Sequence, residues 1–529
     1  MNKYLFVIII LSLIALWPFF RKGYFETHDG EWMVIRFSAF HQTLAARQFP
    51  VRFVDRLNNN YGYPVLNFLY PLPFYLSEVP KALGFGFIDS VKITFISFTV
   101  FSVVAMFWAL SQYFSKYASL AGAIIYLFIP YRFVDLYVRG SLGENVAFTI
   151  APLILGSIFK IAKGQKEFLP VLSVSVALLI ISHNVVAILF MPLFFLLSFL
   201  LIKKDISKIV TTFLVGLLIS AFFWLPALYD LQYVRLSQIN ISNISDHLSS
   251  IERLILPGWG FGQTPQQENG LPTQIGLISL AVLIASTFLH ISAKSKNKII
   301  GSLIILYIAI FALMTNYAST FWQIPHVNII QFPWRLLSLI VLISAILTAF
   351  VVDSVKSKEF AAVLIITVSI VSTIAYTKPP KFVQRDEGFY STNEDTTTVR
   401  EEYLPLWVKQ KPKIRANHKI EIEGDGELTS SQIKPANYEA NINAQRDLIV
   451  RINTIYFPGW QASVDGQDVN INYINNPNGL MSFQLPEGDH KVIIKYGKTP
   501  VHLFSELISL TSLVGTGIYF LFLWRKQNS

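Results

Sequence analysis

The sequence predicts an α-helical polytopic membrane protein with a small β-sandwich domain near the C-terminus. Of its 529 residues, 53% are hydrophobic and only 14% are charged, and the mean hydropathy is +0.48. A soluble core does not need this composition, whereas a set of membrane-spanning helices does. About twelve apolar runs approach the bilayer-spanning length, although several are short. They lie near residues 4–20, 93–114, 118–131, 146–160, 168–182, 184–202, 208–228, 272–292, 298–314, 333–352, 360–376 and 502–524.

The basic residues predict the orientation of these runs. Short loops rich in Lys and Arg stay on the cytoplasmic side of a membrane, and here such residues fall in alternate connections. An even number of spans places both termini on one side. We therefore expect both termini in the cytoplasm, with loop 21–92 and the stretch 377–501 outside the cytoplasmic membrane. The basic residues are Lys160, Lys163, Lys166, Lys203, Lys204, Lys208, Lys294, Lys296, Lys298, Lys356, Lys358, Arg525 and Lys526.

Reporter fusions test this orientation. A periplasm-active reporter fused at residue 420 and a cytoplasm-active reporter fused at residue 296 should both be active, because the two positions are expected on opposite sides. If the fusion at residue 420 were active only inside the cell, the orientation and the site assignments that depend on it would be wrong.

Charge and cysteine content exclude several classes. The net charge of +10 largely reflects the cytoplasmic loops, so we expect no nucleic-acid partner. The chain has no cysteine, which excludes disulfides and thiolate metal sites. The first apolar run lacks a small-residue cleavage site, so it is expected to be retained as a span.

Three domains are predicted along the chain. Residues 1–376 form the transmembrane domain, 377–501 an outer β-rich domain, and 502–529 a last span with a cytoplasmic tail. Short β runs separated by turns such as Asp465-Gly466 and Asn478-Gly479 predict the β domain. The runs are 448–456, 461–464, 469–473, 481–485 and 491–496.

The loop 21–92 is the first candidate for an active site. His28, Asp29 and Glu31 follow the first apolar run directly, so ionisable groups are expected on a turn at the membrane surface. Residues 32–44, which include Arg36, have the apolar spacing of an interfacial amphipathic helix that Pro50 stops. The alternative is an aromatic-rich loop whose charges are simply solvated.

A second charged cluster follows the third apolar run. It contains Arg132, Asp135, Arg139 and Glu144, and the fork of arginine suits a phosphate or pyrophosphate group. Pairing of these arginines with the neighbouring acids is an equally good interpretation.

Further candidates lie at two other expected outer connections. His183 separates two apolar runs, where packing or hydrogen bonding is the commoner role of a histidine. His326 and Arg335 precede the tenth run. Arg335 is a candidate contact for a lipid phosphate, with snorkelling to ordinary headgroups as the alternative.

Several of these motifs resemble a known family. His28-Asp29-Gly30, Gln48-Phe49-Pro50, Tyr61-Gly62-Tyr63-Pro64 and the run 70–75 look like the bacterial membrane family labelled 6-pyruvoyl-tetrahydropterin-synthase-related. The resemblance continues through 131–135, Ser182-His183 and Pro333-Trp334-Arg335, so it covers most of the membrane part. The segment 456–466 is similar to the end of YfhO-type proteins. Both groups look like GT-C glycosyltransferases.

The resemblance implies a reaction and a base. In that superfamily an acid in the first outer loop is the catalytic base, and the donor is usually a sugar on a polyprenyl phosphate; the matching position is Asp29. His28 and Gly30 flank Asp29 where the superfamily more often has paired acids. No cofactor is therefore assigned, and a divalent metal stays an alternative. The expected acceptor is a glycan, lipid or protein of the cell envelope.

The residues can supply this chemistry. A glycosyl transfer needs a base for the acceptor proton and positive charge for the departing phosphate. Arg132, Arg139 and Arg335 are candidates for the second task, and Glu31, Asp55 and Glu144 are second-choice acids for acceptor hydroxyls or for a divalent ion. Aromatic side chains such as Tyr61 offer stacking faces to a sugar. The candidate substrate-binding residues are His28, Glu31, Arg36, Asp55, Tyr61, Arg132, Asp135, Arg139, Glu144, His183, His326 and Arg335.

Two other classes stay open. The chain could transport a lipid-linked sugar, although its charges concentrate in outer loops and not at mid-membrane, where transporters place their sites. It could also be a non-catalytic scaffold of cell-envelope glycan assembly, since loss of catalysis would leave the topology intact.

Overall fold

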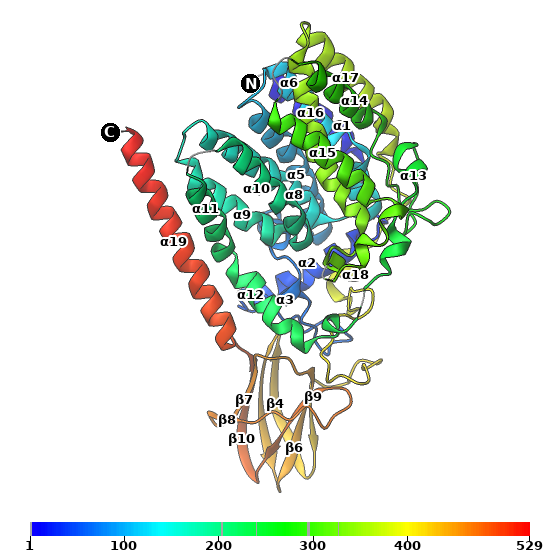
Figure 1. Cartoon of the computed structure of the whole chain (residues 1–529). Coiled ribbons are helices and arrows are strands. Elements are labelled where there is room, and N and C mark those ends of the chain that lie inside the picture. Colours follow the sequence, from blue (N-terminus) through cyan, green and yellow to red (C-terminus); the bar gives the residue numbers. More distant parts are fainter. Residues whose placement is uncertain (1–2, 203–204, 240, 294–296, 326, 529) are drawn as a thin grey trace.

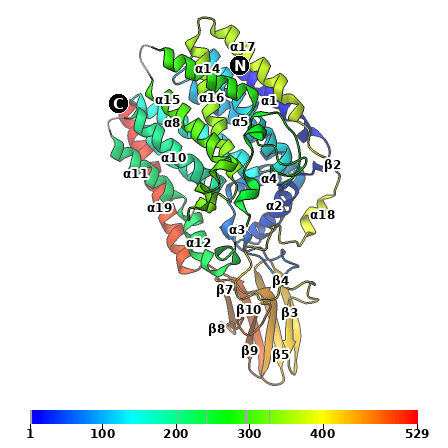
Figure 2. The same cartoon turned by 45° about the vertical axis from the view of Figure 1, so that its right-hand side comes forward.

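The computed structural model describes residues 3–202, 205–239, 241–293, 297–325 and 327–528. Its helices form one bundle, and a β region projects from one end of that bundle (Figure 1). The last helix runs from the β region back along the bundle, so the described chain ends lie at the end away from the strands (Figures 1 and 2). The candidate residue His326 lies outside the described residues. So do four of the lysines that predict the orientation, Lys203, Lys204, Lys294 and Lys296.

The predicted apolar runs are helical. Among the described residues, six helices are long and apolar enough to cross a membrane, and the number rises to as many as eight if each of two bent pairs is one span. Four shorter apolar helices account for the other runs, so the crossing number of twelve stays a prediction. The helices are α1 (Lys3–Ala15), α5 (Phe87–Leu110), α6 (Lys116–Leu127), α8 (Leu142–Ala162), α9 (Phe168–Ser182), α10 (Asn184–Leu201), α11 (Ile206–Ile219), α12 (Ala221–Asp230), α14 (Leu277–Ser292), α15 (Lys298–Leu313), α16 (Leu337–Ser354), α17 (Lys358–Thr373) and α19 (Pro500–Asn528).

One bend lies beside the second charged cluster. Helix α6 ends at Leu127, and the chain continues after Pro130 through α7 (Pro130–Val134) and a π-helical turn, η2 (Asp135–Arg139), at an angle of 43°. Proline lacks a backbone N–H and keeps the preceding residue extended, and Ile129 has φ −120° and ψ 141°. The bend turns the cluster towards the segment that follows α1.

The loop 21–92 is largely structured. It contains β1 (Tyr24–Phe25), α2 (Gly30–Ala45), α3 (Val65–Phe68) and α4 (Leu72–Ala82). The prediction of a helix over 32–44 is confirmed by α2. The prediction that this helix lies at the membrane interface is wrong, because residues 33–40 are all buried and side chains on both faces of the helix are covered.

The cover over α2 comes from the start of the segment 377–501. Strand β2 (Phe382–Val383) pairs with β1 in antiparallel register, and α18 (Glu387–Thr392) packs on α2. Gly23 makes the close approach, since a Cβ at this residue would lie 2.3 Å from the carbonyl oxygen of Val383. The predicted boundary at residue 377 thus falls in a segment that contacts the membrane part, and the two larger sheets begin only at Ile420.

The β region contains two antiparallel sheets, with strand orders β4-β5-β10-β7-β8 and β3-β6-β9. Buried side chains of both sheets belong to one hydrophobic cluster. The predicted run 469–473 is wrong in extent, because β8 ends at Val469. The strands are β3 (Ile420–Glu423), β4 (Gly426–Lys434), β5 (Asn437–Ala444), β6 (Leu448–Ile455), β7 (Trp460–Val464), β8 (Gln467–Val469), β9 (Leu480–Leu485) and β10 (Gly488–Tyr496).

A buried ion pair joins the β region to the loop 21–92. The Lys419 ammonium lies 2.8 Å from Asp55 Oδ1, and both side chains are less than a tenth exposed. The Tyr438 hydroxyl donates a short hydrogen bond to the same Asp55 oxygen. Burial lowers the pKa of Lys419, while the Asp55 carboxylate opposes this shift. The buried ammonium of Lys419 is therefore kept charged by the Asp55 carboxylate beside it.

Candidate functional site

Two backbone hydrogen bonds hold the two charged clusters of the sequence together. The His28 N–H donates to the carbonyl of Val138 at 2.9 Å, and the Asp29 N–H donates to the carbonyl of Arg139 at 2.8 Å. Gly140, with φ +66°, permits this approach, because a Cβ there would lie 2.8 Å from the backbone nitrogen of Gly30. The tertiary structure thus makes one site of residues more than 100 positions apart.

The Asp29 side chain is available to a ligand. It precedes the first residue of α2, is partly exposed, and makes no hydrogen bond or ion pair with a described residue. The N-terminus of a helix favours negative charge, so the carboxylate is stabilised without being neutralised. Beside it, His28 Nε2 lies 3.0 Å from the carbonyl oxygen of Phe261, an acceptor to which the imidazole N–H can donate. This contact connects the site to the loop 229–271.

Arg139 belongs to a buried network. Its Nη1 lies 3.1 Å from Asp135 Oδ1 and makes a short contact with Glu144 Oε2. The Tyr131 hydroxyl donates to Glu144 Oε1 at 2.7 Å, and the Arg139 guanidinium covers the ring of Trp334. Arg139 thus forms the internal ion pairs with neighbouring acids that were the alternative to phosphate binding. Such a network orients the Arg139 backbone, which in turn holds Asp29.

Arg132 makes no ion pair with this network, although Asp135 and Glu144 lie within electrostatic reach of its guanidinium. It is fully buried among the helices, where Nη2 donates to Ser102 Oγ and Asn145 Oδ1 at 3.2 and 3.3 Å. Its guanidinium lies 4.1 Å from the centre of the Phe148 ring. Unlike the partly exposed Asp29, the Arg132 side chain is fully enclosed by its neighbours.

Arg36 and Arg335 differ from Arg139 in having no acid partner among the described residues. Arg335 Nη1 donates to the carbonyl of Ile330 and to Gln331 Oε1, both at 3.0 Å, and its buried Nε has no partner. Arg36 donates through Nε to Thr397 Oγ1 at 3.0 Å and through Nη2 to the Thr397 carbonyl. Both side chains are nearly buried, and neither guanidinium forms an ion pair with a described carboxylate.

Tyr70 lies near several of these charged groups, although no sequence pattern gave it a role. Asp29, Arg36, Arg139 and Arg335 all lie within electrostatic reach of its hydroxyl. Burial and, next, the Asp29 carboxylate raise the pKa of Tyr70, so the phenol stays protonated. The run of Tyr and Pro at 70–75 was the only sequence signal for it.

His183 packs against this tyrosine. The two rings stack with centroids 4.7 Å apart, and His183 Nδ1 accepts a hydrogen bond of 3.3 Å from the N–H of Val186 at the start of α10. These contacts agree with packing and hydrogen bonding, and a part for His183 in substrate binding stays a prediction.

The other candidates have different surroundings. Glu31 Oε1 lies 3.0 Å from both the Tyr390 hydroxyl and Arg385 Nε, which ties the first turn of α2 to the segment after β2. Asp55 is paired with Lys419, and the Tyr61 carbonyl accepts a hydrogen bond from the N–H of Ile455 at 2.7 Å. Asp55 and Tyr61 thus face the β region. No group of three or more His, Asp or Glu side chains converges as a metal site in the described ranges.

The fold and the site define an integral membrane protein with a charged site at one end of its helices. The chain belongs to the family of membrane proteins described as the 6-pyruvoyl-tetrahydropterin synthase related domain, whose model matches residues 66–379. No curated protein sequence matches it. Two cryo-EM structures of the arabinofuranosyltransferase AftD from mycobacteria, one of them a mutant, are similar at 13% identity with TM-scores of 0.46 and 0.45. The matches cover 74% and 71% of this chain but only 28% of AftD.

Proposed function

We propose that this protein is a membrane glycosyltransferase of the GT-C type. It would move a sugar from a polyprenyl-phosphate donor to a glycan, lipid or protein acceptor outside the cytoplasmic membrane. The observation that best supports this proposal is the Asp29 carboxylate, which has no described partner and, like three arginines, lies within electrostatic reach of Tyr70. An acid free to accept a proton next to fixed positive charge is what transfer from a phosphate requires.

In the proposed reaction, Asp29 takes the proton from the acceptor hydroxyl. The hydroxyl oxygen forms a bond to the anomeric carbon while the bond from that carbon to the phosphate oxygen breaks. The electron pair leaves with the phosphate, and the single displacement inverts the anomeric centre. A positioned general base contributes about 10²- to 10⁴-fold to such a step.

Arg335 and Arg36 are the proposed phosphate ligands. Their guanidinium groups form no ion pair with a described acid, so an incoming phosphate could form charge-assisted hydrogen bonds with them. Arg139 is already offset by Asp135 and Glu144, which gives it a positioning role. This assignment gives a phosphate-binding role to Arg36, which the sequence named only as a substrate-binding candidate. It leaves out Arg132, because Arg132 is enclosed by the helices.

Tyr70 would donate a hydrogen bond in the same site. Its raised pKa keeps the hydroxyl protonated at neutral pH, so it can donate to a phosphate oxygen or to a sugar hydroxyl. Stacking on His183 fixes the direction of the phenol.

Replacement of Arg335 tests the phosphate site. Arg335→Gln should weaken binding of a polyprenyl-phosphate sugar by about 10- to 100-fold, the range expected for loss of hydrogen bonds to a charged group. The measurement is donor binding to purified full-length protein, together with product formation over a range of donor concentrations. Because Asp29 is unchanged, product formation should recover in part at high donor concentration.

Two variants complete this experiment. Arg335→Lys keeps the charge and should retain more donor affinity than Arg335→Gln. Arg253→Gln is the matched control, since Arg253 is exposed and its side chain has no ion pair with a described acid. Equal donor binding by wild type and Arg335→Gln would contradict the assignment of Arg335.

A further inference from the structure

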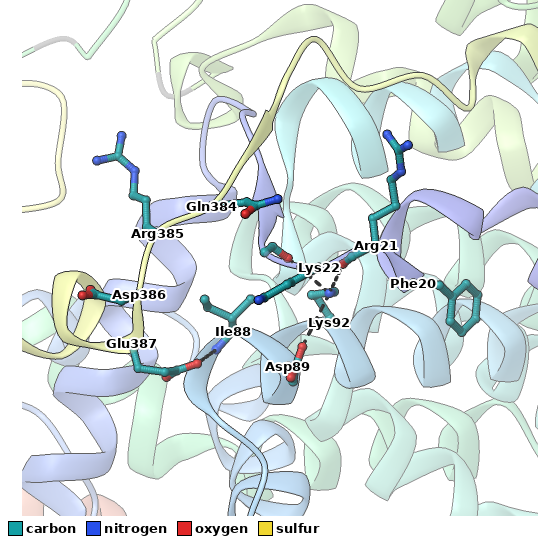
Figure 3. Close-up of a pocket in the computed structure, with 11 residues that line it drawn as sticks. Phe20, Arg21, Lys22, Ile88, Asp89, Lys92, Gln384, Arg385, Asp386 and Glu387 are labelled. Atoms are coloured by element: carbon teal, nitrogen blue, oxygen red, sulfur yellow. Dashed lines mark hydrogen bonds and ion pairs between the residues drawn. The ribbon is translucent and has the colours of Figure 1, made fainter.

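A cavity of about 410 Å³ lies outside the site described above (Figure 3). Its walls are the turn 20–23 that follows α1, the first turns of α5, and the segment 384–387 between β2 and α18. Asp29, Tyr70 and the arginines proposed to bind the donor do not line it.

Each acidic side chain that lines this cavity already forms an ion pair or accepts a hydrogen bond from the protein. Asp89 Oδ1 lies 3.5 Å from the Lys92 ammonium. Glu387 accepts hydrogen bonds from the N–H groups of Phe87 and Ile88 at 2.7 and 3.3 Å, which caps the N-terminus of α5. The Asp386 side chain accepts a hydrogen bond of 2.8 Å from the N–H of Phe389 at the start of α18. Asp386 and Glu387 have no basic partner among the described residues, but their charges face the N-termini of α18 and α5, where negative charge is stabilised.

Two of the basic residues that line the cavity form no ion pair with a described acid. Lys92 donates to the carbonyls of Arg21 and Gly23 at 2.6 and 3.2 Å, so its ammonium holds the turn in place. Lys22 is exposed and has no hydrogen bond or ion pair with any described residue. Figure 3 shows its side chain reaching in among the lining residues, towards Ile88. Arg21, at the rim, stacks on the ring of Phe382 and has no acid partner in the described structure.

An apolar stripe leads to this cavity along α1. Its exposed side chains recur every three or four residues, so they lie on one face of the helix, and the stripe continues past the helix end. Trp and basic residues directly after an apolar run are typical of a membrane interface. The exposed residues are Phe6, Ile10, Leu13, Ile14, Trp17 and Phe20.

We propose that this cavity binds the phosphate headgroup of an anionic phospholipid whose acyl chains lie along the α1 stripe. Lys22 and Arg21 form no ion pair with a described acid and can therefore bind a headgroup with net negative charge, and the stripe favours a lipid over a free anion. This site is separate from the proposed donor site. The bound headgroup would also steady the start of α2, because Arg385 of the same wall contacts Glu31 at 3.0 Å.

Lipid-dependent stabilisation of the full-length protein tests the proposal. Thermal unfolding in detergent is followed while phosphatidylglycerol, phosphatidylcholine or inorganic phosphate is added. Phosphatidylglycerol should raise the unfolding temperature, and Lys22→Gln should need about fivefold more of it for half the effect, since one basic residue near an anionic surface contributes about 1 kcal/mol. Lys22→Arg should behave like wild type.

Lys378→Gln is the matched control. Lys378 is an exposed lysine near the same end of the bundle, but it does not line the cavity, so its replacement should leave the lipid response unchanged. An equal response of wild type and Lys22→Gln to phosphatidylglycerol would overturn the proposal. An equal response to phosphatidylcholine would overturn the preference for an anionic headgroup, and an equal response to inorganic phosphate would make the site one for free anions.

Discussion

Asp29→Asn is expected to reduce sugar transfer by about 10²-fold or more, the usual contribution of a general base. Asparagine keeps the size of the side chain but cannot accept the acceptor's proton. Because the Asp29 side chain has no described partner to lose, the protein level, the unfolding temperature and donor binding should change little. The measurement is product formation by purified protein from a polyprenyl-phosphate sugar donor.

The matched control is Asp468→Asn, which removes an exposed carboxylate on β8 in the β region. It should transfer sugar at the wild-type rate. Near-normal transfer by well-expressed Asp29→Asn would exclude Asp29 as the base. Glu31, in the first turn of the same helix, would then be the next acid to replace, and the scaffold interpretation would gain weight.

Asp55→Asn should destabilise the protein by about 3 to 5 kcal/mol, the usual cost of leaving one partner of a buried ion pair without the other. Lys419 would remain buried with its ammonium unpaired, and the Tyr438 hydroxyl would lose its charged acceptor. The measurement is chemical or thermal unfolding of the full-length protein. The release of the β region should be the first transition, because this pair joins it to the loop 21–92.

A second ion pair of the same region provides the control. Asp425 lies 3.8 Å from Arg446, but both side chains are more than three-fifths exposed, so Asp425→Asn should have no measurable effect on unfolding. Lys419→Met combined with Asp55→Asn removes both charges and should restore part of the stability. If Asp55→Asn unfolds like wild type, the ion pair does not hold the two parts together.

Much of the fold could be read from periodicity and turn residues. Long apolar runs need no tertiary context to become helices, and Asp465-Gly466 forms its turn with both residues at positive φ, as the dipeptide predicts. Strand β5 was missed, because its inward residues Tyr438, Ala440, Ile442 and Ala444 include two alanines between polar neighbours, which weakens the alternating signal. The helix α2 was placed correctly, but its burial depends on α18, which lies about 350 residues later in the chain.

The sequence by itself determined the membrane class, the helical runs, the presence of a C-terminal β region and the importance of the segment around Asp29. Only the tertiary structure decided which charges are free. Arg132, Arg139 and Arg335 look alike in the sequence, yet the first is enclosed by helices, the second is offset by Asp135 and Glu144, and the third has no acid partner among the described residues. The physical reason is that a charge is neutralised by whatever lies within a few ångströms of it. The approach of Asp29, Arg139 and Arg335 to Tyr70 arises from the packing of separate elements, which local sequence patterns do not encode.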